Sequence, residues 1–390
     1  MTFRLLLILG ALSAFAPFAI DMYLPSFPTL ARVFATDIEH VQLSLAVYFA
    51  GLASGQLFYG PLADRFGRRP PLLIGIGLFC LGSLGCALAP SLSWLIAARF
   101  VQALGGCAGM VIARAVVRDL CEPMAAARAF SQIMLVTGIA PIIAPLVGSL
   151  LLSAFGWQAI FISLALFAGA CGAAVALWLP ESLPAQHARP PLSGALRNYL
   201  RLLRDRHFIG HTLTGGVAMA GMFAYISGSP FVLIELYGVA PEHYGWLFGL
   251  NAAGFILFGQ LNARLVVRQG PVFWLRRTVL AYAAAGLLLL LVGAFQPKSL
   301  VVFMLPLFCA IALLGGIVPN TSACALAGQG ANAGSASALM GSLQYVLAAL
   351  AASAVGVLHN GTVVPLCAVL ALCAVATALL SRWTHSHSSA

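Results

Sequence analysis

The segment that most limits the fold of this chain is Ser299–Ser381, where 83 consecutive residues include no Asp, Glu, Lys or Arg. About 20 apolar residues in a helix span the hydrocarbon core of a bilayer, so this segment predicts three membrane crossings. The whole chain is 61% hydrophobic and 8% charged. This composition excludes a water-soluble globular protein.

The same pattern of apolar runs predicts twelve crossings over the whole chain. The first run looks like a signal peptide, but no small-residue cleavage site follows it and further spans do, so we interpret it as a retained helix. Prolines and glycines punctuate the links between runs. The expected crossings are 4–26, 41–61, 71–89, 94–116, 131–153, 157–179, 209–234, 243–264, 275–295, 300–322, 333–357 and 362–382.

The links between crossings carry their positive charge on one side. Seventeen arginines fall on that side, whereas only Arg32 and Lys298 fall on the other. Cytoplasmic loops are rich in Lys and Arg, so we expect a multi-pass membrane protein with both termini in the cytoplasm. The same placement explains the net charge of +10 without nucleic acid as a partner.

The polar stretch Pro180–Phe208 divides the crossings into two sets of six. We therefore predict an all-α membrane protein of two pseudo-symmetric six-helix bundles, with an N-terminal bundle over 1–180, a linker over 181–208 and a C-terminal bundle over 209–390. The sequence Gly60-Pro-Leu-Ala-Asp-Arg65 follows crossing two, and Gly259-Gln-Leu-Asn-Ala-Arg264 follows crossing eight. Internal duplication of this kind is a feature of many transporters.

Part of the linker has the periodicity of an amphipathic helix. Over Leu192–Arg206 one helical face collects apolar residues and another collects arginines. This pattern predicts a helix on the cytoplasmic membrane surface, and a flexible linker remains an open alternative. The predicted apolar face consists of Leu196, Tyr199, Leu200 and Leu203.

Asp21 is the one formal charge in the apolar run Leu5–Ala31. An ionised carboxylate in hydrocarbon costs roughly 2.5–3.5 kcal/mol or more, so such a residue faces a cavity, finds a partner or takes up a proton. A cap at the outer end of the helix is the structural alternative. We expect a functional role for Asp21.

Nothing in the sequence indicates an enzyme or a metal site. The nine cysteines occur singly, with neither a CxxC motif nor metal-ligand spacing. His207 and His211 are four residues apart but have no third ligand in the pattern. No Gly-rich phosphate loop is present, so ATP is not implied, and we expect no cofactor.

The most specific motif is the stretch from Gly60 to Leu73, which reads Gly-Pro-Leu-Ala-Asp-Arg-Phe-Gly-Arg-Arg-Pro-Pro-Leu-Leu. Gly60 and Gly67 are expected to permit a tight turn, with Asp64 pairing locally. This stretch resembles the cytoplasmic loop motif of the major facilitator superfamily. The resemblance implies that Asp64 contacts the start of crossing eleven, near Asn332–Ser337, and latches the outward-open state. The expected conformational-switch residues of this loop are Gly60, Asp64, Arg65, Gly67, Arg68 and Arg69.

Two further stretches resemble motifs of the same superfamily, with departures. Arg99-Phe-Val-Gln102 is similar to the Arg-x-x-Gln motif of proton-coupled members, although Ala103 replaces the usual glycine. The stretch from Gly138 to Gly148 is similar to the antiporter motif, although Ala144 and Ser149 replace expected glycines. Ordinary membrane-helix kinking is the alternative for this second stretch. Its expected switch residues are Pro141, Pro145 and Gly148.

A narrower similarity comes from three short stretches, each quoted as it stands. They are Ala19-Ile-Asp21-Met-Tyr23-Leu-Pro25, Arg114-Ala-Val-Val-Arg118-Asp119 and Ser227-Gly-Ser-Pro230-Phe-Val-Leu. Together they resemble the bicyclomycin-resistance and chloramphenicol-resistance branch of drug:proton antiporters. The resemblance covers nearly the whole chain.

The two intramembrane charges are expected at similar depth. Asp21 falls in the outer part of crossing one, and Arg99 comes five residues after the interfacial Trp94 of crossing four. Opposite charges that are buried seek each other, so we predict that they approach directly, through water or through Gln102. Burial disfavours ionisation of the carboxyl group and the arginine favours it, so Asp21 could exchange protons near neutral pH. A permanent structural ion pair is the alternative.

Polar and aromatic residues inside the apolar runs are candidates for the drug cavity. Few polar contacts among many apolar ones suit varied lipophilic molecules, although each residue could equally pack between helices. The candidates are Tyr48, Gln56, Met134, Tyr225, Ser227, Phe231, Asn251, Gln344 and Tyr345.

Together with the intramembrane charges, the resemblance implies a proton-coupled exporter of small lipophilic antibiotics in the bacterial inner membrane that works by alternating access. We expect a monomer whose partners are the drug, protons and the lipid bilayer. An importer or uniporter of a small nutrient or metabolite is the alternative, against which the antiporter-like prolines and Asp21 argue.

Overall fold

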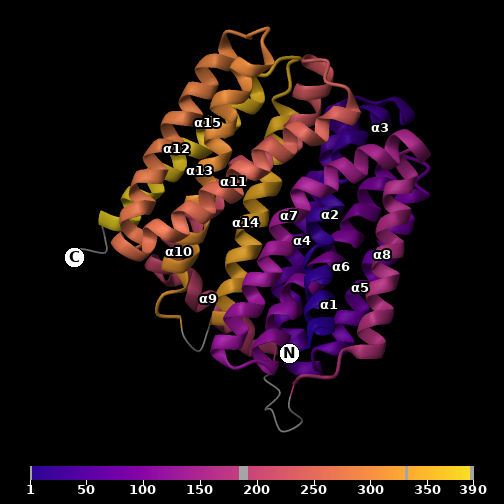
Figure 1. Cartoon of the computed structure of the whole chain (residues 1–390), viewed down its shortest axis with the longest axis vertical. Coiled ribbons are helices and arrows are strands. Elements are labelled where there is room, and N and C mark those ends of the chain that lie inside the picture. The colour runs from indigo at the N-terminus through magenta and orange to yellow at the C-terminus, as the bar shows by residue number, and fades with distance from the viewer. Residues whose placement is uncertain (1, 184–191, 330–332, 387–390) are drawn as a thin grey trace.

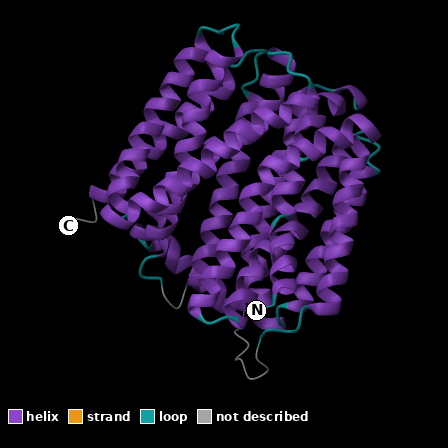
Figure 2. Ribbon diagram, viewed as in Figure 1, coloured by secondary structure: helices purple, strands orange, loops and turns teal. Residues whose placement is uncertain are grey.

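The computed structural model describes residues 2–183, 192–329 and 333–386. All regular structure in the described part of the chain is helical (Figure 2). Twelve of its helices are long and apolar enough to cross a membrane, which confirms the predicted fold class. The protein is therefore a multi-pass membrane protein.

The first crossing, Phe3–Val33, is built from four pieces, whereas most of the others are single helices. The pieces are α1 (Phe3–Ser13), α2 (Phe15–Asp21), the 3₁₀ turn η1 (Leu24–Ser26) and α3 (Phe27–Val33). The next five crossings are α4 (Ile38–Phe66), α5 (Arg69–Ala87), α6 (Leu92–Leu120), α7 (Pro123–Phe155) and α8 (Trp157–Trp178). After α9 (Leu192–Arg204) come α10 (Arg206–Pro230) with the π-helical η2 (Phe231–Leu236), α11 (Pro241–Gln269), α12 (Pro271–Ala294), α13 (Leu300–Leu326), α14 (Ala333–Val357) and α15 (Val364–Ser386).

Prolines explain where the first crossing breaks. A proline removes the N–H that would bond to the carbonyl four residues earlier, and its ring crowds that carbonyl. Pro17 leaves the carbonyl of Ser13 without this bond, and α1 ends at Ser13. Pro25 does the same to the carbonyl of Asp21, where α2 ends. The sequence thus places Asp21 at an interruption of the helix.

The two halves of the chain pack their helices in the same pattern. In the first half α4 packs on α6, α5 on α6 and α5 on α8. The corresponding helices of the second half repeat it: α11 packs on α13, α12 on α13 and α12 on α15. The halves meet through two equivalent pairs, α4 with α14 and α7 with α11, and they lie side by side in Figure 1.

Small residues allow the closest helix contacts within the first half. A Cβ at Gly105 of α6 would collide with the backbone of Phe79 in α5, and one at Gly51 of α4 would collide with Ala103. Side-chain packing rather than hydrophobic burial drives helix association in lipid, so small residues at these contacts let the backbones approach.

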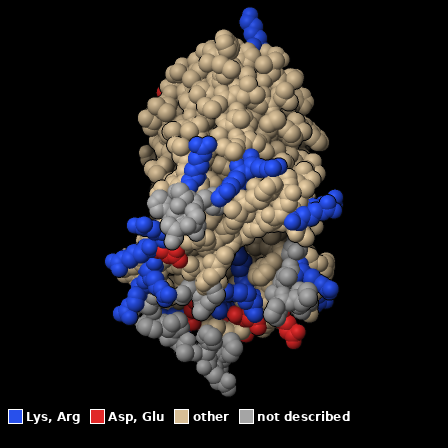
Figure 3. Space-filling model, turned by 90° about the vertical axis from the view of Figure 1, so that its left-hand side faces the viewer, with Lys and Arg blue, Asp and Glu red and all other residues tan. Residues whose placement is uncertain are grey.

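We call one end of the molecule the basic end, because Arg65, Arg68, Arg69 and Arg118 lie there, at the α4–α5 link and the end of α6. The described chain starts at this end, where α1 begins in Figure 1. In the face seen in Figure 3, Lys and Arg side chains gather in the lower half. This arrangement agrees with the predicted asymmetry of charge.

The predicted linker helix is present as α9. The hydroxyl of Tyr199 donates to the backbone carbonyl of Leu57 at 3.1 Å, and Leu202 is buried beside Phe208. The face turned to the protein is therefore built on Tyr199 and Leu202, and of these two Tyr199 belongs to the predicted apolar face. The other leucines of that predicted face are exposed, namely Leu196, Leu200 and Leu203.

Candidate functional site

Asp21 lies at the end of α2 and is 3% exposed. Its Oδ1 atom has no hydrogen-bond partner among the described residues. The phenol groups of Tyr225 in α10, Tyr244 in α11 and Tyr345 in α14 lie within electrostatic reach of its carboxyl group. Asp21 belongs to the first half, and the η1 turn that follows it contacts α10 and α11 of the second half.

Arg99 of α6 is fully buried. Its Nη1 donates to the carbonyl of Ala19 at 2.9 Å and to Oε1 of Gln102 at 2.6 Å. The guanidinium carbon lies 4.0 Å from the ring centroid of Tyr48 and 4.7 Å from that of Tyr23. Aromatic faces attract a desolvated cation, so they replace part of the hydration that burial removes.

The predicted direct contact of Asp21 with Arg99 is not formed in this structure, since neither the ion pairs nor the hydrogen bonds of the described residues join the two side chains. The last carbonyls of a helix have no intrahelical partner. Ala19 is two residues from the end of α2, and its carbonyl takes the donor that we had expected to reach the carboxylate. Gln102 bonds to Arg99, but no hydrogen bond of the described residues joins Gln102 to Asp21, so the predicted route through Gln102 is not formed either.

Gln102 extends this cluster to α5. Its Nε2 donates to Oγ of Ser83 at 2.8 Å, and that hydroxyl donates to the carbonyl of Phe79. Ser83 and Tyr23 belong to this cluster but were not predicted from the sequence. Tyr23 stands in the quoted stretch around Asp21, so its position was visible, whereas an isolated serine in an apolar run carries no signal.

Some candidate cavity residues meet near this centre. Tyr225 accepts a hydrogen bond from Nδ2 of Asn251 at 3.0 Å, and Tyr48 covers Arg99. The ring of Tyr345 packs with Phe223 and Phe49, at 5.7 and 6.3 Å between centroids. Residues from both halves therefore form one aromatic cluster.

The other candidates lie apart from this centre or differ in environment. Met134 is 70% exposed on α7, one helical turn after Phe130, which lines the cavity at the basic end. Phe231 is the first residue of η2, directly after α10. Its ring packs on that of His359, which follows the end of α14. Ser227 is buried, Gln344 is half-buried near Gly216, and Gln56 lines a cavity at the basic end.

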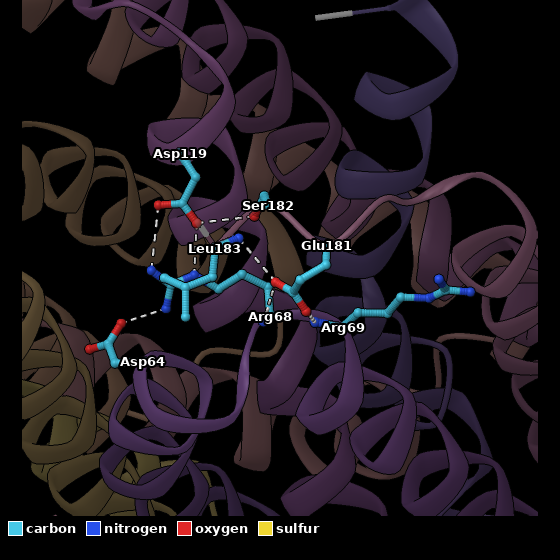
Figure 4. A network of polar contacts seen from close by, with 7 residues as sticks. All are labelled: Asp64, Arg68, Arg69, Asp119, Glu181, Ser182 and Leu183. Carbon is cyan, nitrogen blue, oxygen red and sulfur yellow. Dashed lines mark hydrogen bonds and ion pairs between the residues drawn. The ribbon is translucent and has the colours of Figure 1, made fainter. Parts of the chain in front are cut away.

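The loop motif forms a network of charges that Figure 4 shows. Arg68 pairs with Asp64 and donates from Nε to Asp119 at 2.8 Å, and Asp119 also accepts from Ser182. Burial lowers the pKa of Arg68, but the bonds and charges of Asp119 and Asp64 outweigh it and raise that pKa overall. Arg68 is therefore a stable cation that joins α4 to the end of α6.

Glu181 closes the other side of this network (Figure 4). Its carboxylate accepts the backbone N–H of Arg68 at 2.8 Å and that of Arg69 at 3.1 Å, at the start of α5. Burial raises the pKa of Glu181, but these N–H donors and that of Leu183 outweigh it and lower the pKa overall. Neither Glu181 nor Asp119 was predicted from the sequence to take part in this network.

The glycines of this motif differ from expectation. Gly67 has φ of +93° and faces the Glu181 carboxylate, so it requires glycine as predicted. Gly60 instead lies within α4, so the predicted turn at this residue is wrong. No atom lies within 4 Å of the position that a Cβ would take at Gly60. Arg65 lies over the ring of Phe66 and Arg69 donates to the carbonyl of Ala176.

The expected contact of Asp64 with the start of crossing eleven is not formed within the described residues. Asn332 lies outside them, and Asp64 pairs with Arg68 and shares a cavity wall with Gly334 and Ser337. This cavity at the basic end has a volume of about 530 Å³ and is bounded by α4, α6, α7, α9 and α14. The two halves are therefore parted at the basic end.

The opposite end is closed between the halves. Nε2 of His359, after α14, lies 2.9 Å from Oε1 of Glu39 in α4. Oγ of Ser149 in α7 donates to the carbonyl of Pro241 in α11 at 2.8 Å. The structure is thus open at the basic end and closed at the other.

The antiporter-like stretch packs against the break in the first crossing. Pro141 and Pro145 lie inside α7, which continues through both. A Cβ at Gly148 would collide with the backbone of Met22, the residue after Asp21. Gly148 therefore lets α7 approach the interruption next to the buried carboxyl group.

Comparison with known proteins agrees with this architecture. The sequence profile described as "Major Facilitator Superfamily" matches residues 9–352. This chain belongs to the major facilitator superfamily. It is a membrane transporter and not an enzyme.

Two similar proteins of the superfamily cover nearly the whole chain. The Bacillus subtilis (strain 168) "Uncharacterized MFS-type transporter YdgK" is 37% identical over 375 residues, which are 94% of this chain and 92% of that protein. The "Bicyclomycin resistance protein homolog" of Haemophilus influenzae is 32% identical over 383 residues, 97% of this chain and 95% of that one. The second relative confirms the resemblance to drug-resistance members.

A solved structure confirms the major facilitator fold. The xylose transporter XylE from E. coli, in a partially occluded inward-open conformation, matches with a TM-score of 0.74, covering 97% of this chain and 96% of that one. At 15% sequence identity this likeness concerns the fold alone.

Proposed function

We propose that this transporter exports small lipophilic antibiotics across the bacterial inner membrane in exchange for protons. The observation that carries the proposal is the burial of Asp21 between the halves with no ion-pair partner among the described residues. An uncompensated carboxylate in this position is costly. A proton on Asp21 removes that cost, so the group suits a carrier whose charge changes during the cycle.

The proposed orientation places the basic end and both termini in the cytoplasm. The cavity of about 530 Å³ then opens inward, and the contacts of Glu39 with His359 and of Ser149 with Pro241 close the outer side. In this inward-open conformation Asp21 carries a proton. The cycle alternates this state with one in which the outer contacts part and the inner ones close.

Asp21 and Arg99 have separate roles in this cycle. Arg99 holds the broken first crossing through the carbonyl of Ala19 and stays charged between aromatic rings. Asp21 is free to gain and lose its proton. A drug that reaches the aromatic cluster of Phe49, Phe223 and Tyr345 changes the environment of Asp21 and favours release of the proton to the cytoplasm. By reciprocity, protonation of Asp21 weakens drug binding.

The substrate class is supported by the cluster and by one relative. The central contacts between the halves come from aromatic side chains with few polar atoms, which suits varied lipophilic molecules. A relative 32% identical over nearly the whole chain carries the name bicyclomycin resistance protein homolog. We therefore expect neutral antibiotics such as bicyclomycin or chloramphenicol among the exported drugs.

Inside-out membrane vesicles test the exchange. Vesicles that hold the protein are energised until the interior is acidic, and a pH-sensitive dye reports the interior pH when bicyclomycin or chloramphenicol is added. We expect drug-dependent proton release from the wild type and none from Asp21→Asn, at equal amounts of folded protein. Proton release that is independent of drug, or equal in both proteins, would contradict the proposal and favour the alternative of a nutrient carrier.

A further inference from the structure

Two arginines of α6 face the cavity at the basic end and are used by neither the charge network nor the proton site. Arg114 and Arg118 both line the cavity, and at a spacing of four residues they share one face of α6. Asp119, the next residue, turns to Arg68 instead. The helix thus separates a structural carboxylate from two cavity-facing cations.

The charge of this cavity is unbalanced. Arg197 of α9 joins Arg114 and Arg118 in the lining, and no ion pair among the described residues involves any of the three. The lining carboxylate, Asp64, is paired with Arg68. The charged side chains in the cavity lining are four arginines and one aspartate, which gives the lining a net charge of +3 (4 − 1).

The preference for positive charge on cytoplasmic links does not account for Arg114. This residue lies six positions before the end of α6, about 9 Å deeper along the helix axis at 1.5 Å per residue. Its guanidinium lies within electrostatic reach of Tyr345, the same residue whose phenol is within reach of Asp21. Arg114 is therefore placed between the cavity mouth and the central site.

Apolar side chains complete the cavity wall around these charges. Val111 and Ile112 of α6 and Phe130 of α7 line it. A cleft with charges of one sign and low-dielectric walls raises the local concentration of oppositely charged molecules by roughly tenfold or more. It repels molecules of its own sign to a comparable degree.

We propose that the cavity is a binding site for small amphiphilic organic anions, with Arg114 and Arg118 contacting the anionic group and the apolar wall contacting the body of the molecule. As a statement about cargo this inference rests on the proposed export function, and it adds organic anions to the neutral drugs. It also means that lipophilic cations are poor substrates. An anionic lipid headgroup offers the same chemistry, so the test separates the two sources.

The test measures binding of three probes with one scaffold, 1-naphthoate, 1-naphthamide and 1-naphthylmethylamine, to the full chain in nanodiscs of phosphatidylcholine. We expect naphthoate to bind about tenfold more tightly than the amide, and the amine to bind least. The variant R114Q/R118Q should lose this preference, and R114K/R118K should retain most of it. The control R268Q/R276Q removes two exposed arginines elsewhere and should behave as the wild type.

This binding test needs no proton gradient. Its failure can therefore be told apart from failure of the proposed export function. Equal binding of naphthoate and naphthamide, a preference that survives in R114Q/R118Q, or no binding of naphthoate would overturn it. The same affinity when phosphatidylglycerol is added assigns the site to free organic anions. Loss of naphthoate binding in that lipid assigns the site to a headgroup and overturns the proposal for cargo.

Discussion

Arg99 donates a hydrogen bond of 2.9 Å to the backbone carbonyl of Ala19. The bond ties α6 to the last turn of α2, two residues before the carboxyl group of Asp21. A backbone acceptor holds the arginine without neutralising it, and the rings of Tyr48 and Tyr23 supply the remaining stabilisation. We infer that the positive charge is structural, whereas the negative charge nearby is the one that changes.

The first prediction concerns Arg99→Lys. An ammonium group cannot lie flat between two rings while it bonds to both Ala19 and Gln102. We expect the variant to lose roughly 2 kcal/mol of stability, the size of a desolvated cation–π contact, and most of its transport. Thermal unfolding in detergent measures the loss. The matched control is Arg277→Lys, because Arg277 is exposed and lies 4.3 Å from the Phe273 ring, and it should cost under about 1 kcal/mol. Equal losses in both variants would refute this account of Arg99.

The second prediction concerns Gly148→Ala. The added Cβ meets the backbone of Met22, which cannot rotate away, so we expect a loss of about 1–3 kcal/mol from overpacking. Gly169→Ala in α8 is the control, because no atom lies within 4 Å of the added Cβ, and it should leave the melting temperature unchanged or slightly raised. A Gly148→Ala protein as stable and active as the control would show that the close approach is unimportant.

The third prediction concerns the closed end. His359 and Glu39 are partly buried, and such a pair is worth about 1 kcal/mol. Replacing His359 with alanine should therefore raise the population of the outward-open conformation about fivefold. A cysteine in place of the buried Gln42, in an otherwise cysteine-free protein, should react about fivefold faster with an impermeant thiol reagent added outside. His243→Ala at the same end removes an exposed histidine and should not change the rate, and a similar rise there would argue against the gate.

The fourth prediction concerns Glu181 and pH. The backbone N–H groups of Arg68, Leu183 and Arg69 lower the pKa of its carboxyl group in the folded protein, although burial opposes them. The stability that this gives is present above the ordinary carboxyl pKa near 4.5 and is lost as pH falls through the lower folded value. Glu181→Gln should lower the free energy of unfolding by about 1 kcal/mol at neutral pH, as loss of a helix cap does. Below about pH 4.5 the free energy of unfolding of this variant should depend less on pH than that of the wild type. An unchanged pH profile would show that Glu181 does not cap α5.

Periodicity and charge placement predicted most of this fold. Runs of apolar residues located all twelve crossings, and the Gly, Pro and Arg motifs located the loop between α4 and α5. The break at Asp21 follows from Pro25 by a local rule. These features depend on residues close together in the chain, so one sequence is enough to read them.

Contacts between distant segments could not be read in the same way. The direct pairing of Asp21 with Arg99 was expected from charge and depth, but the orphan carbonyl of Ala19 took the donor. Met134 lies in an apolar run, and its 70% exposure depends on how α7 packs against other segments, which periodicity does not give. The capping role of Glu181 joins residues more than 100 positions apart, a separation at which no spacing rule applies.

The central claim, that drug binding removes a proton from Asp21, is tested most directly by proton release from the purified protein. The protein is mixed with bicyclomycin or chloramphenicol in weakly buffered detergent solution, and a pH dye reports the protons released per drug bound. The account predicts about one proton per drug for the wild type and none for Asp21→Asn, which still binds the drug. Drug binding without proton release in the wild type, or equal release from both proteins, would contradict it.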